Sequence, residues 1–264
     1  MISISDISVR FGQGTPNEMT ALRNLSLEIA QGEFVTVIGS NGAGKSTLLN
    51  TVAGTVKPTT GQIAIDGTDV THQKPHMRAR SVARVFQDPM VGTCESLSIE
   101  ENMALAANRT QPRGLRRAIK TDSRGMFQTS LKKLGLGLEH RLSDRAGLLS
   151  GGQRQAVSLL MATLSPSKIL LLDEHTAALD PNASDLVLGL TETIVSDSKM
   201  TALMVTHSMA HALRYGTRLL MMHQGKIVYD MAGAEKSKLT VADLLALFKD
   251  LAGGDIDDDK MLLA

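Results

Sequence analysis

The sequence is poor in the residues that build disulfide frameworks and aromatic platforms. It has one cysteine, Cys94, no tryptophan, and only 3% aromatic residues. A single cysteine excludes an intrachain disulfide and is typical of a protein from a reducing compartment. The shortage of aromatic rings argues against a platform on which single-stranded nucleic acid stacks its bases.

The sequence also lacks an excess of charge and a long hydrophobic run. The 28 Lys and Arg residues nearly balance the 27 Asp and Glu residues, so bulk charge favours neither nucleic acid nor an anionic membrane surface. The most apolar stretch, Gln155–Leu172, is interrupted by Ser165, Pro166, Ser167 and Lys168, and a membrane span needs roughly 18 apolar residues. The start, MISISDISVR, has no basic segment before an apolar run. We therefore expect neither a signal peptide nor a membrane-spanning helix.

The 264 residues do contain an alternation of strand-like and helix-like segments. At about 150 residues per domain, this length corresponds to one large domain or two small ones. Apolar runs rich in β-branched residues alternate with helical periodicity, which is typical of an α/β fold with a largely parallel sheet. The expected strands are Ser3–Phe11, Leu25–Ile29, Phe34–Ile38, Gly61–Ile65, Val82–Phe86, Ile169–Leu172, Ala202–Thr206, Arg218–Met222 and Lys226–Asp230. The expected helices are Lys45–Ala53, Gln153–Leu164, Ala183–Ser196, Ala210–Tyr215 and Ala234–Ala252.

Two regions depart from this alternation. The early strands lie close together in the chain, so we expect them to pair antiparallel as a small layer on the main sheet. Between Glu95 and Arg145 the strand pattern is absent, whereas Glu100–Asn108 and Met126–Leu134 have helical periodicity. This pattern predicts a helical insert in an otherwise α/β domain.

One segment matches a phosphate-binding pattern without a gap. Gly39–Ser46 reads Gly-Ser-Asn-Gly-Ala-Gly-Lys-Ser, follows the apolar run Phe34–Ile38 and opens an expected helix, as the pattern GxxxxGK[ST] requires. Glycines let the backbone turn its N–H groups toward phosphate oxygens, and the helix N-terminus adds a positive dipole end. Lys45 would reach the β- and γ-phosphates, Ser46 would be a ligand of Mg²⁺, and Thr47 would hold the α-phosphate. The candidate phosphate-binding residues are Gly39, Asn41, Gly42, Gly44, Lys45, Ser46 and Thr47.

A second candidate site is an apolar strand that ends in two acids. Ile169–Leu172 is followed by Asp173 and Glu174. A buried parallel strand accounts for the apolar residues, but not for two acids at its carboxyl end, where ligands bind in open α/β sheets. Asp173 would hold Mg²⁺ through water, and Glu174 would act as the general base on the attacking water.

Four further segments resemble motifs of one family, the ABC ATPases. Leu149–Gln155 reads Leu-Ser-Gly-Gly-Gln-Arg-Gln and resembles the signature motif of that family. Ala178–Asp180 resembles the D-loop, Phe86–Asp88 resembles the Q-loop, and His207, just after an expected strand, resembles the switch histidine. These motifs keep the order and spacing of the family, so the resemblance covers the chain from residue 3 to about residue 230.

The resemblance implies a P-loop NTPase fold with a RecA-like core, an antiparallel β subdomain and an inserted helical subdomain. The ATPase domain would span residues 1–252, with the core and β layer in 1–87 and 164–252. The helical subdomain, which carries the signature motif, would span 88–163. Residues 253–264 would form an acidic C-terminal tail.

The resemblance also implies that two copies of the chain sandwich two ATP molecules head to tail. Ser150 and Gly152 of one copy would face the γ-phosphate held by Lys45 of the other, as an anion site at a helix N-terminus. Asp180 of the D-loop would also belong to this nucleotide site. Cofactors implied are ATP and Mg²⁺.

The remaining roles follow from the same resemblance. His207 would contact the γ-phosphate, and Gln87 would contact the Mg²⁺ or the water. Phe11, at the end of the first strand, is placed to stack on adenine, with a core aromatic as the alternative. His175 stands where the family usually has proline, and it is either a tolerated substitution or a titratable group in the loop.

A single ATPase unit without a membrane span implies a separate permease. The segment Leu97–Ala106 resembles the segment after the Q-loop in importers, and Asp173–Pro181 is similar to a group of ATPase components that work with solute-binding proteins. Some of that group resemble aromatic amino acid importers. We therefore expect an ATPase subunit of an amino acid-type importer, peripheral to the cytoplasmic face of the cell membrane. The alternatives are an efflux or lipoprotein-release subunit, which Gln13–Thr20 mildly resembles, and a soluble ATP-dependent switch.

Overall fold

The computed structural model describes residues 1–111, 119 and 123–251. The chain divides into two units, one of Met1–Arg78 with Lys199–Ala264 and the other of Ala79–Ser198, and each is described by itself. The second unit includes residues 88–163, the span predicted for a helical subdomain, together with flanking segments. The predicted acidic tail at 253–264 lies outside the described residues.

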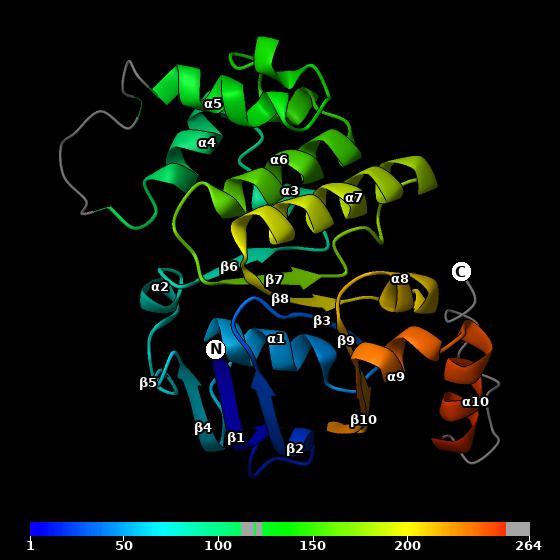
Figure 1. Ribbon diagram of the computed structural model, residues 1–264. Coiled ribbons are helices and arrows are strands. Elements are labelled where there is room, and N and C mark those ends of the chain that lie inside the picture. The colour runs from blue at the N-terminus through cyan, green and yellow to red at the C-terminus, as the bar shows by residue number, and fades with distance from the viewer. Residues whose placement is uncertain (112–118, 120–122, 252–264) are drawn as a thin grey trace. The chain divides into compact units, whose positions relative to one another are not determined.

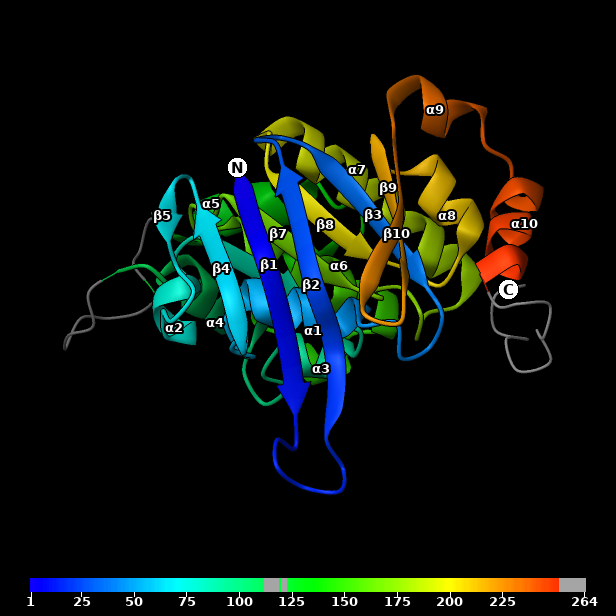
Figure 2. The same ribbon diagram turned by 90° about the horizontal axis from the view of Figure 1, so that it is seen from below.

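The first unit contains an antiparallel sheet of four strands in the order β2-β1-β4-β5. Figure 2 shows β1, β2 and β4 side by side. The strands are β1 (Ile2–Phe11), β2 (Met19–Ile29), β4 (Thr60–Ile65) and β5 (Thr68–Asp69). The expected antiparallel layer is thus confirmed. The predicted strand Leu25–Ile29 was too short, because pairing with β1 continues past polar residues as far as Phe11 opposite Met19.

A second group of strands in this unit surrounds β3 (Phe34–Gly39), which is buried along its whole length. It runs parallel to β8 (Thr201–Val205) and to β9 (Arg218–His223). The strand β10 (Lys226–Ala232) pairs antiparallel with β9. A strand buried on both faces is rich in apolar residues, which Phe34, Val35, Val37 and Ile38 supply.

The helices of the first unit are α1 (Lys45–Ala53), α2 (Pro75–Arg78), α8 (Met209–Arg214), α9 (Gly233–Lys238) and α10 (Val241–Leu251). The prediction of one helix over Ala234–Ala252 was wrong. Leu239 is extended, and Thr240 starts a new helix by capping. Its Oγ1 accepts from the N–H of Asp243 at 3.2 Å, and the Asp243 carboxylate accepts from the N–H of Thr240 at 2.8 Å. This reciprocal pair satisfies donors at the start of α10.

The second unit contains β6 (Val82–Val85) and β7 (Ile169–Asp173), which pair in parallel. Figure 1 shows its helices, of which α6 and α7 run side by side. The helices are α3 (Pro89–Gly92), α4 (Ile99–Ala107), α5 (Ser123–Lys132), α6 (Gly151–Thr163) and α7 (Pro181–Ser198), with short 3₁₀ turns at Leu138–His140 and Ala146–Leu148.

The predicted helical insert between Glu95 and Arg145 is confirmed for the residues that the structure describes. In that part only an isolated bridge joins Ser98 to Arg145. The insert has its own apolar core, in which Met103, Phe127 and other side chains from α4, α5 and α6 are buried together. Among the described residues, no helix is long and apolar enough to cross a bilayer.

Candidate functional site

The phosphate loop joins β3 to α1 in the first unit, and neighbouring backbone leaves no room for side chains at two of its glycines. A Cβ on Gly39 would lie 2.3 Å from the carbonyl oxygen of Met222 on β9. A Cβ on Gly44 would lie 2.6 Å from the carbonyl oxygen of Ala21 on β2, and Gly44 has a φ of 99°. Neither backbone oxygen can move away as a flexible side chain could, so both positions require glycine.

Lys45 is buried at the first position of α1 and is held by the loop itself. Its Nζ donates to the carbonyl oxygens of Gly39 at 2.6 Å and Ser40 at 3.0 Å. These two acceptors compensate the burial of the ammonium group. The other loop positions differ in exposure. Asn41, Gly42 and Ser46 are exposed, whereas Gly44 and Thr47 are half-buried.

The N-terminus of α1 is suited to an anion. Gly44 precedes the helix and provides no side-chain hydrogen bond to its first turn. The first N–H groups of a helix have no partner inside the helix, and they lie at the positive end of its dipole. A phosphate group fits this position, and the nearby ammonium group of Lys45 adds positive charge.

Two further predicted residues belong to this unit. Val37 of β3 pairs with Val205 of β8, and the N–H of Thr206 donates to the carbonyl oxygen of Val37 at 3.1 Å. His207 therefore leaves the sheet at the edge where β3 enters the phosphate loop. Phe11 is 41% exposed at the end of β1. Its exposure contradicts the alternative of a core aromatic and leaves a ring face for stacking.

The acid pair lies at the carboxyl end of β7 in the second unit. Arg84 of β6 donates from Nη2 to Oδ2 of Asp173 at 2.5 Å. The guanidinium carbon of Arg84 lies 4.8 Å from the centre of the Phe86 ring. Arg84 is not among the predicted site residues, although an isolated charge in the apolar run Val82–Phe86 indicates that a partner is needed.

Glu174 follows in a backbone conformation that non-glycine residues rarely adopt, with a φ of 46°. The turn closes through the N–H of Ala177, which donates to the carbonyl oxygen of Glu174 at 2.9 Å. His175 is buried, and its Nε2 lies 3.0 Å from Oγ1 of Thr191 on α7. The histidine is therefore part of the packed interior beneath the turn. Thr191 was missed, because nothing local in the sequence links it to His175.

The signature and D-loop residues cap helices. Ser150 is exposed and caps α6, where its hydroxyl accepts from the N–H of Gln153 at 3.3 Å. A Cβ on Gly152 would lie 2.7 Å from the Cβ of Ala183, so this glycine lets α6 approach α7 closely. Asp180 accepts from the N–H of Ala183 at 3.1 Å. The helix α6 thus presents an exposed serine at its positive end.

Gln87 lies two residues after the end of β6 and is exposed. Asp88 then caps α3 by accepting from the N–H of Met90 at 2.8 Å. The side chains predicted to hold Mg²⁺ are Ser46, Gln87 and Asp173, and all three offer oxygen atoms. Oxygen ligands, few of them carboxylates, suit Mg²⁺ bound together with substrate phosphates. The residues present therefore fit both a nucleotide and the metal.

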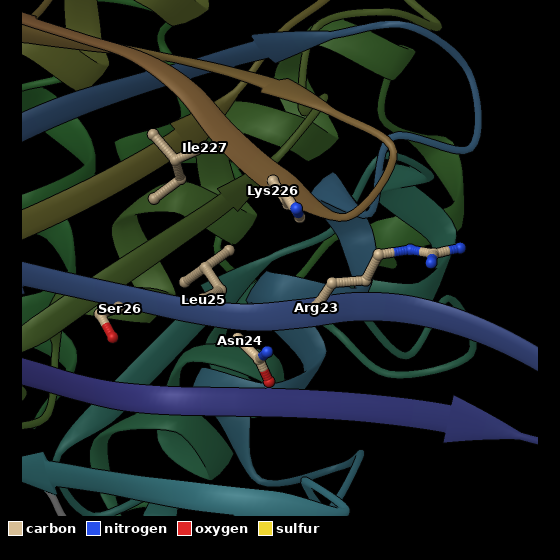
Figure 3. A pocket seen from close by; sticks show the side chains of 6 residues that line it. All are labelled: Arg23, Asn24, Leu25, Ser26, Lys226 and Ile227. Carbon is tan, nitrogen blue, oxygen red and sulfur yellow. The ribbon is translucent and has the colours of Figure 1, made fainter.

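A separate pocket of about 380 Å³ lies in the first unit between β2 and β10. Figure 3 shows its lining, which includes the side chains of Arg23 and Lys226. The N–H of Arg23 donates to the carbonyl oxygen of Gly225 at 2.9 Å, and the N–H of Gly225 donates to that of Ala43 at 3.0 Å. The strand β2 thus supports the phosphate loop through the turn at Gly225. None of the predicted site residues lines this pocket.

Comparisons with known proteins identify the family of this chain. The family model described as ABC transporter matches residues 22–177. The chain is 45% identical over 251 residues to a tyrosine transport ATP-binding protein of Clostridioides difficile, covering 94% of this chain and 99% of the relative. It is 35% identical over 239 residues to the phosphonates import ATP-binding protein of Thiobacillus denitrificans, covering 89% of each.

The fold has solved counterparts as well. A dimeric ATP-binding cassette in a post-hydrolysis state, bound to ADP and Pi, matches with a TM-score of 0.73 at 26% identity, covering 88% of this chain and 98% of the other. The predicted α/β P-loop fold and the family resemblance are thereby confirmed. The chain belongs to the ABC transporter family, as an ATP-binding subunit with the fold of an ABC-type ATPase.

Proposed function

We propose that this chain hydrolyses ATP to drive a separate membrane permease that imports an amino acid-like solute. The observation that supports this proposal is the 45% identity to a protein described as a tyrosine transport ATP-binding protein, of which 99% of the length is covered. Other relatives are described as import proteins for different solutes, such as phosphonates. The solute class therefore rests on the higher identity to the tyrosine relative. The subunit would act at the cytoplasmic face of the membrane.

In the proposed site, the phosphate loop binds the phosphates of ATP. The N–H groups of the loop and of α1 donate to phosphate oxygens, as do the side chains of Lys45 and Thr47. Lys45 exchanges its two carbonyl acceptors in the loop for phosphate oxygens. His207 donates to the γ-phosphate, and Phe11 stacks on the adenine ring. The glycines at 39 and 44 keep the backbone close enough for these contacts.

The hydrolytic groups are those of the second unit. Glu174 accepts a proton from the attacking water, and Gln87 orients that water. Ser46, Gln87 and Asp173 would hold Mg²⁺, which would supply positive charge against the charge that develops on the phosphate oxygens. For Asp173 to do so, its ion pair with Arg84 must open or share the carboxylate.

We further propose that two copies close around two ATP molecules. The support is the exposed Ser150 at the N-terminus of α6, a helix of 13 residues whose positive end suits an anion. In the isolated chain the hydroxyl of Ser150 accepts from the N–H of Gln153. In the dimer this end would face the γ-phosphate of the other copy, with Gly152 and Asp180 beside it. A related cassette is described as dimeric in its solved structure with ADP and Pi.

The surface of α3 is the proposed contact with the permease. Met90 and Val91 on this short helix are both exposed, directly after the Q-loop. Exposed apolar side chains of this size are common at sites of protein contact. Cys94 is exposed two residues beyond α3. As the single cysteine of the chain, it can carry a cross-linker without further engineering.

The test is a purification of tagged Glu174→Gln from the membranes of the source cell with Mg-ATP, followed by mass spectrometry. This variant keeps the phosphate loop and should trap the closed dimer, because the general base is lost. A small hydrophobic permease together with a solute-binding protein is the expected result. A permease with a large extracytoplasmic domain and no binding protein would indicate export instead. Recovery of soluble proteins alone would refute the transport role.

Two control variants sharpen this experiment. Lys45→Ala should lose ATP affinity and therefore the ATP-dependent partners. Met90→Asp combined with Val91→Asp should lose the permease but keep ATP hydrolysis by the isolated subunit. Val241→Asp is the matched control, since Val241 is an exposed apolar residue on α10 in the other unit. It should retain the permease.

A further inference from the structure

A buried glutamine of α6 joins the two loops that carry Gln87 and Glu174. Gln155 is completely buried. Its Nε2 donates to the carbonyl oxygen of Phe86 at 2.9 Å and to that of His175 at 2.7 Å. Phe86 immediately precedes Gln87, and His175 immediately follows Glu174. One side-chain amide therefore fixes the backbone next to both residues.

The orientation of this amide follows from its surroundings. Both N–H donors of Gln155 face carbonyl oxygens, whereas Oε1 is buried with no hydrogen-bond partner among the described residues. A flipped amide would point Oε1 at two carbonyl oxygens that cannot donate to it, so the nitrogen is the atom that faces them. A buried acceptor without a partner destabilises a folded chain. Local costs of this kind are expected at functional positions.

The backbone of Glu174 needs such support. Its φ of 46° is unfavourable for a residue with a Cβ, and it persists only where the surroundings hold it. His175 is held on two sides, by Gln155 of α6 at its carbonyl oxygen and by Thr191 of α7 at its ring. The turn of Glu174 is therefore anchored to both helices through the residue that follows it.

We propose that Gln155 is a positioning residue for ATP hydrolysis, which holds the loops of Gln87 and Glu174 together from α6. This inference rests on the roles proposed above for those two residues. The same helix begins next to Ser150, five residues before Gln155 in the sequence. A shift of α6 would change both hydrogen bonds of Gln155 at once, so contact at Ser150 would be felt at both loops.

The test compares turnover with nucleotide affinity in Gln155→Met. Methionine keeps the length of the side chain but removes both donors. Because a misplacement of about 1 Å costs on the order of 100-fold in rate, kcat per nucleotide-binding site should fall about 10- to 100-fold. The Kd for a fluorescent ATP analogue, set by the phosphate loop, should stay within about threefold of the wild type. Gln155→Glu keeps the shape, but an ionised carboxylate offers only acceptors, so this variant should lose at least as much.

Asn102→Leu provides a matched control in the same unit. Asn102 is also a buried amide, and its Nδ2 donates to the carbonyl oxygens of Cys94 and Ser98, both at 2.9 Å. These hydrogen bonds reach neither of the proposed hydrolytic loops. This variant should lower the melting temperature while kcat per binding site stays the same. Counting sites by nucleotide binding restricts each measurement to folded protein.

The inference is refuted if Gln155→Met hydrolyses ATP within about twofold of the wild-type rate, or if Asn102→Leu loses as much kcat as Gln155→Met. Glu174→Gln is measured in parallel. If it is inactive while Gln155→Met is fully active, only the inference about Gln155 fails. If Glu174→Gln itself hydrolyses ATP normally, the proposed role of Glu174 fails whatever Gln155 does.

Discussion

Replacing Thr191 by valine should destabilise the protein by removing one buried hydrogen bond to His175. The hydroxyl of Thr191 donates to the carbonyl oxygen of Val187 at 2.8 Å, which leaves its oxygen to accept from Nε2 of His175 at 3.0 Å. Both Thr191 and His175 are almost completely buried. Valine has nearly the same shape as threonine but cannot accept this hydrogen bond.

The expected magnitude comes from the group that loses its partner. A buried donor left without an acceptor costs about 1–3 kcal/mol. The carbonyl oxygen of Val187 keeps its place in the hydrogen-bond ladder of α7, so it adds little to this loss. For a protein of this size each kcal/mol lowers the melting temperature by about 2–4 °C, which gives a shift of about 2–12 °C.

Urea denaturation of four proteins measures this effect as a double-mutant cycle: wild type, Thr191→Val, His175→Ala and the double variant. The coupling energy between the two positions should be about 1 kcal/mol or more. Thr193→Val is the matched control, since Thr193 lies on the same helix and donates to the carbonyl oxygen of Gly189 at 3.0 Å but is exposed. It should change stability by no more than about 0.5 kcal/mol. Equal losses at Thr191 and Thr193, or a coupling energy of zero, would refute the reasoning.

Three other substitutions test separate features. Gly44→Ala places a Cβ 2.6 Å from the carbonyl oxygen of Ala21 at a φ of 99°, so it should cost about 2–5 kcal/mol in stability. It should also lower the ATP affinity measured by calorimetry, and an undisturbed affinity would contradict the tight fit. Arg84→Gln frees Asp173 from its ion pair and should lower the half-saturating Mg²⁺ concentration for nucleotide binding on the order of tenfold. The measurement is a titration with a fluorescent ATP analogue, and a higher Mg²⁺ requirement would show that Arg84 supports the metal instead. Burial lowers the pKa of Lys236 to about 8. Because the unfolded lysine stays protonated to about pH 10.4, the unfolded chain binds more protons between these two pH values. The stability of the wild type relative to Lys236→Met should therefore rise with pH across that window. Unfolding free energies from urea titrations at pH 7 to 10 that change in parallel for the two proteins would contradict it.

The phosphate loop could be predicted because its determinants are contiguous in the chain. An apolar strand, a glycine pattern and a helix former follow one another, and α1 has the expected bounds Lys45–Ala53. The acid pair could be located for a similar reason, since Asp173 and Glu174 end an apolar run. Their roles remain predictions, whereas the positions of these segments at strand ends are observed.

The partners of these residues could not be predicted, because they lie far away in the sequence. Arg84 and Asp173 are 89 residues apart, and Gln155 and Phe86 are 69 apart. A glutamine within an apolar helix face indicates burial but not which carbonyl groups it binds. The break at Leu239 was missed for a different reason. The apolar periodicity continues across it, and the capping pair of Thr240 and Asp243 outweighs that pattern locally.

The division of these residues between the two units has a consequence for function. The loop proposed to bind phosphates belongs to the first unit, whereas Glu174, Gln87 and the contacts that hold them belong to the second. The two hydrogen bonds from Lys45 to the carbonyl oxygens of Gly39 and Ser40 do not involve Gln155. Substitutions at Gly44 should therefore act mainly on affinity, and substitutions at Gln155 mainly on turnover. A variant at Gln155 that bound ATP normally and hydrolysed it slowly would separate the two steps without altering any group that touches the nucleotide.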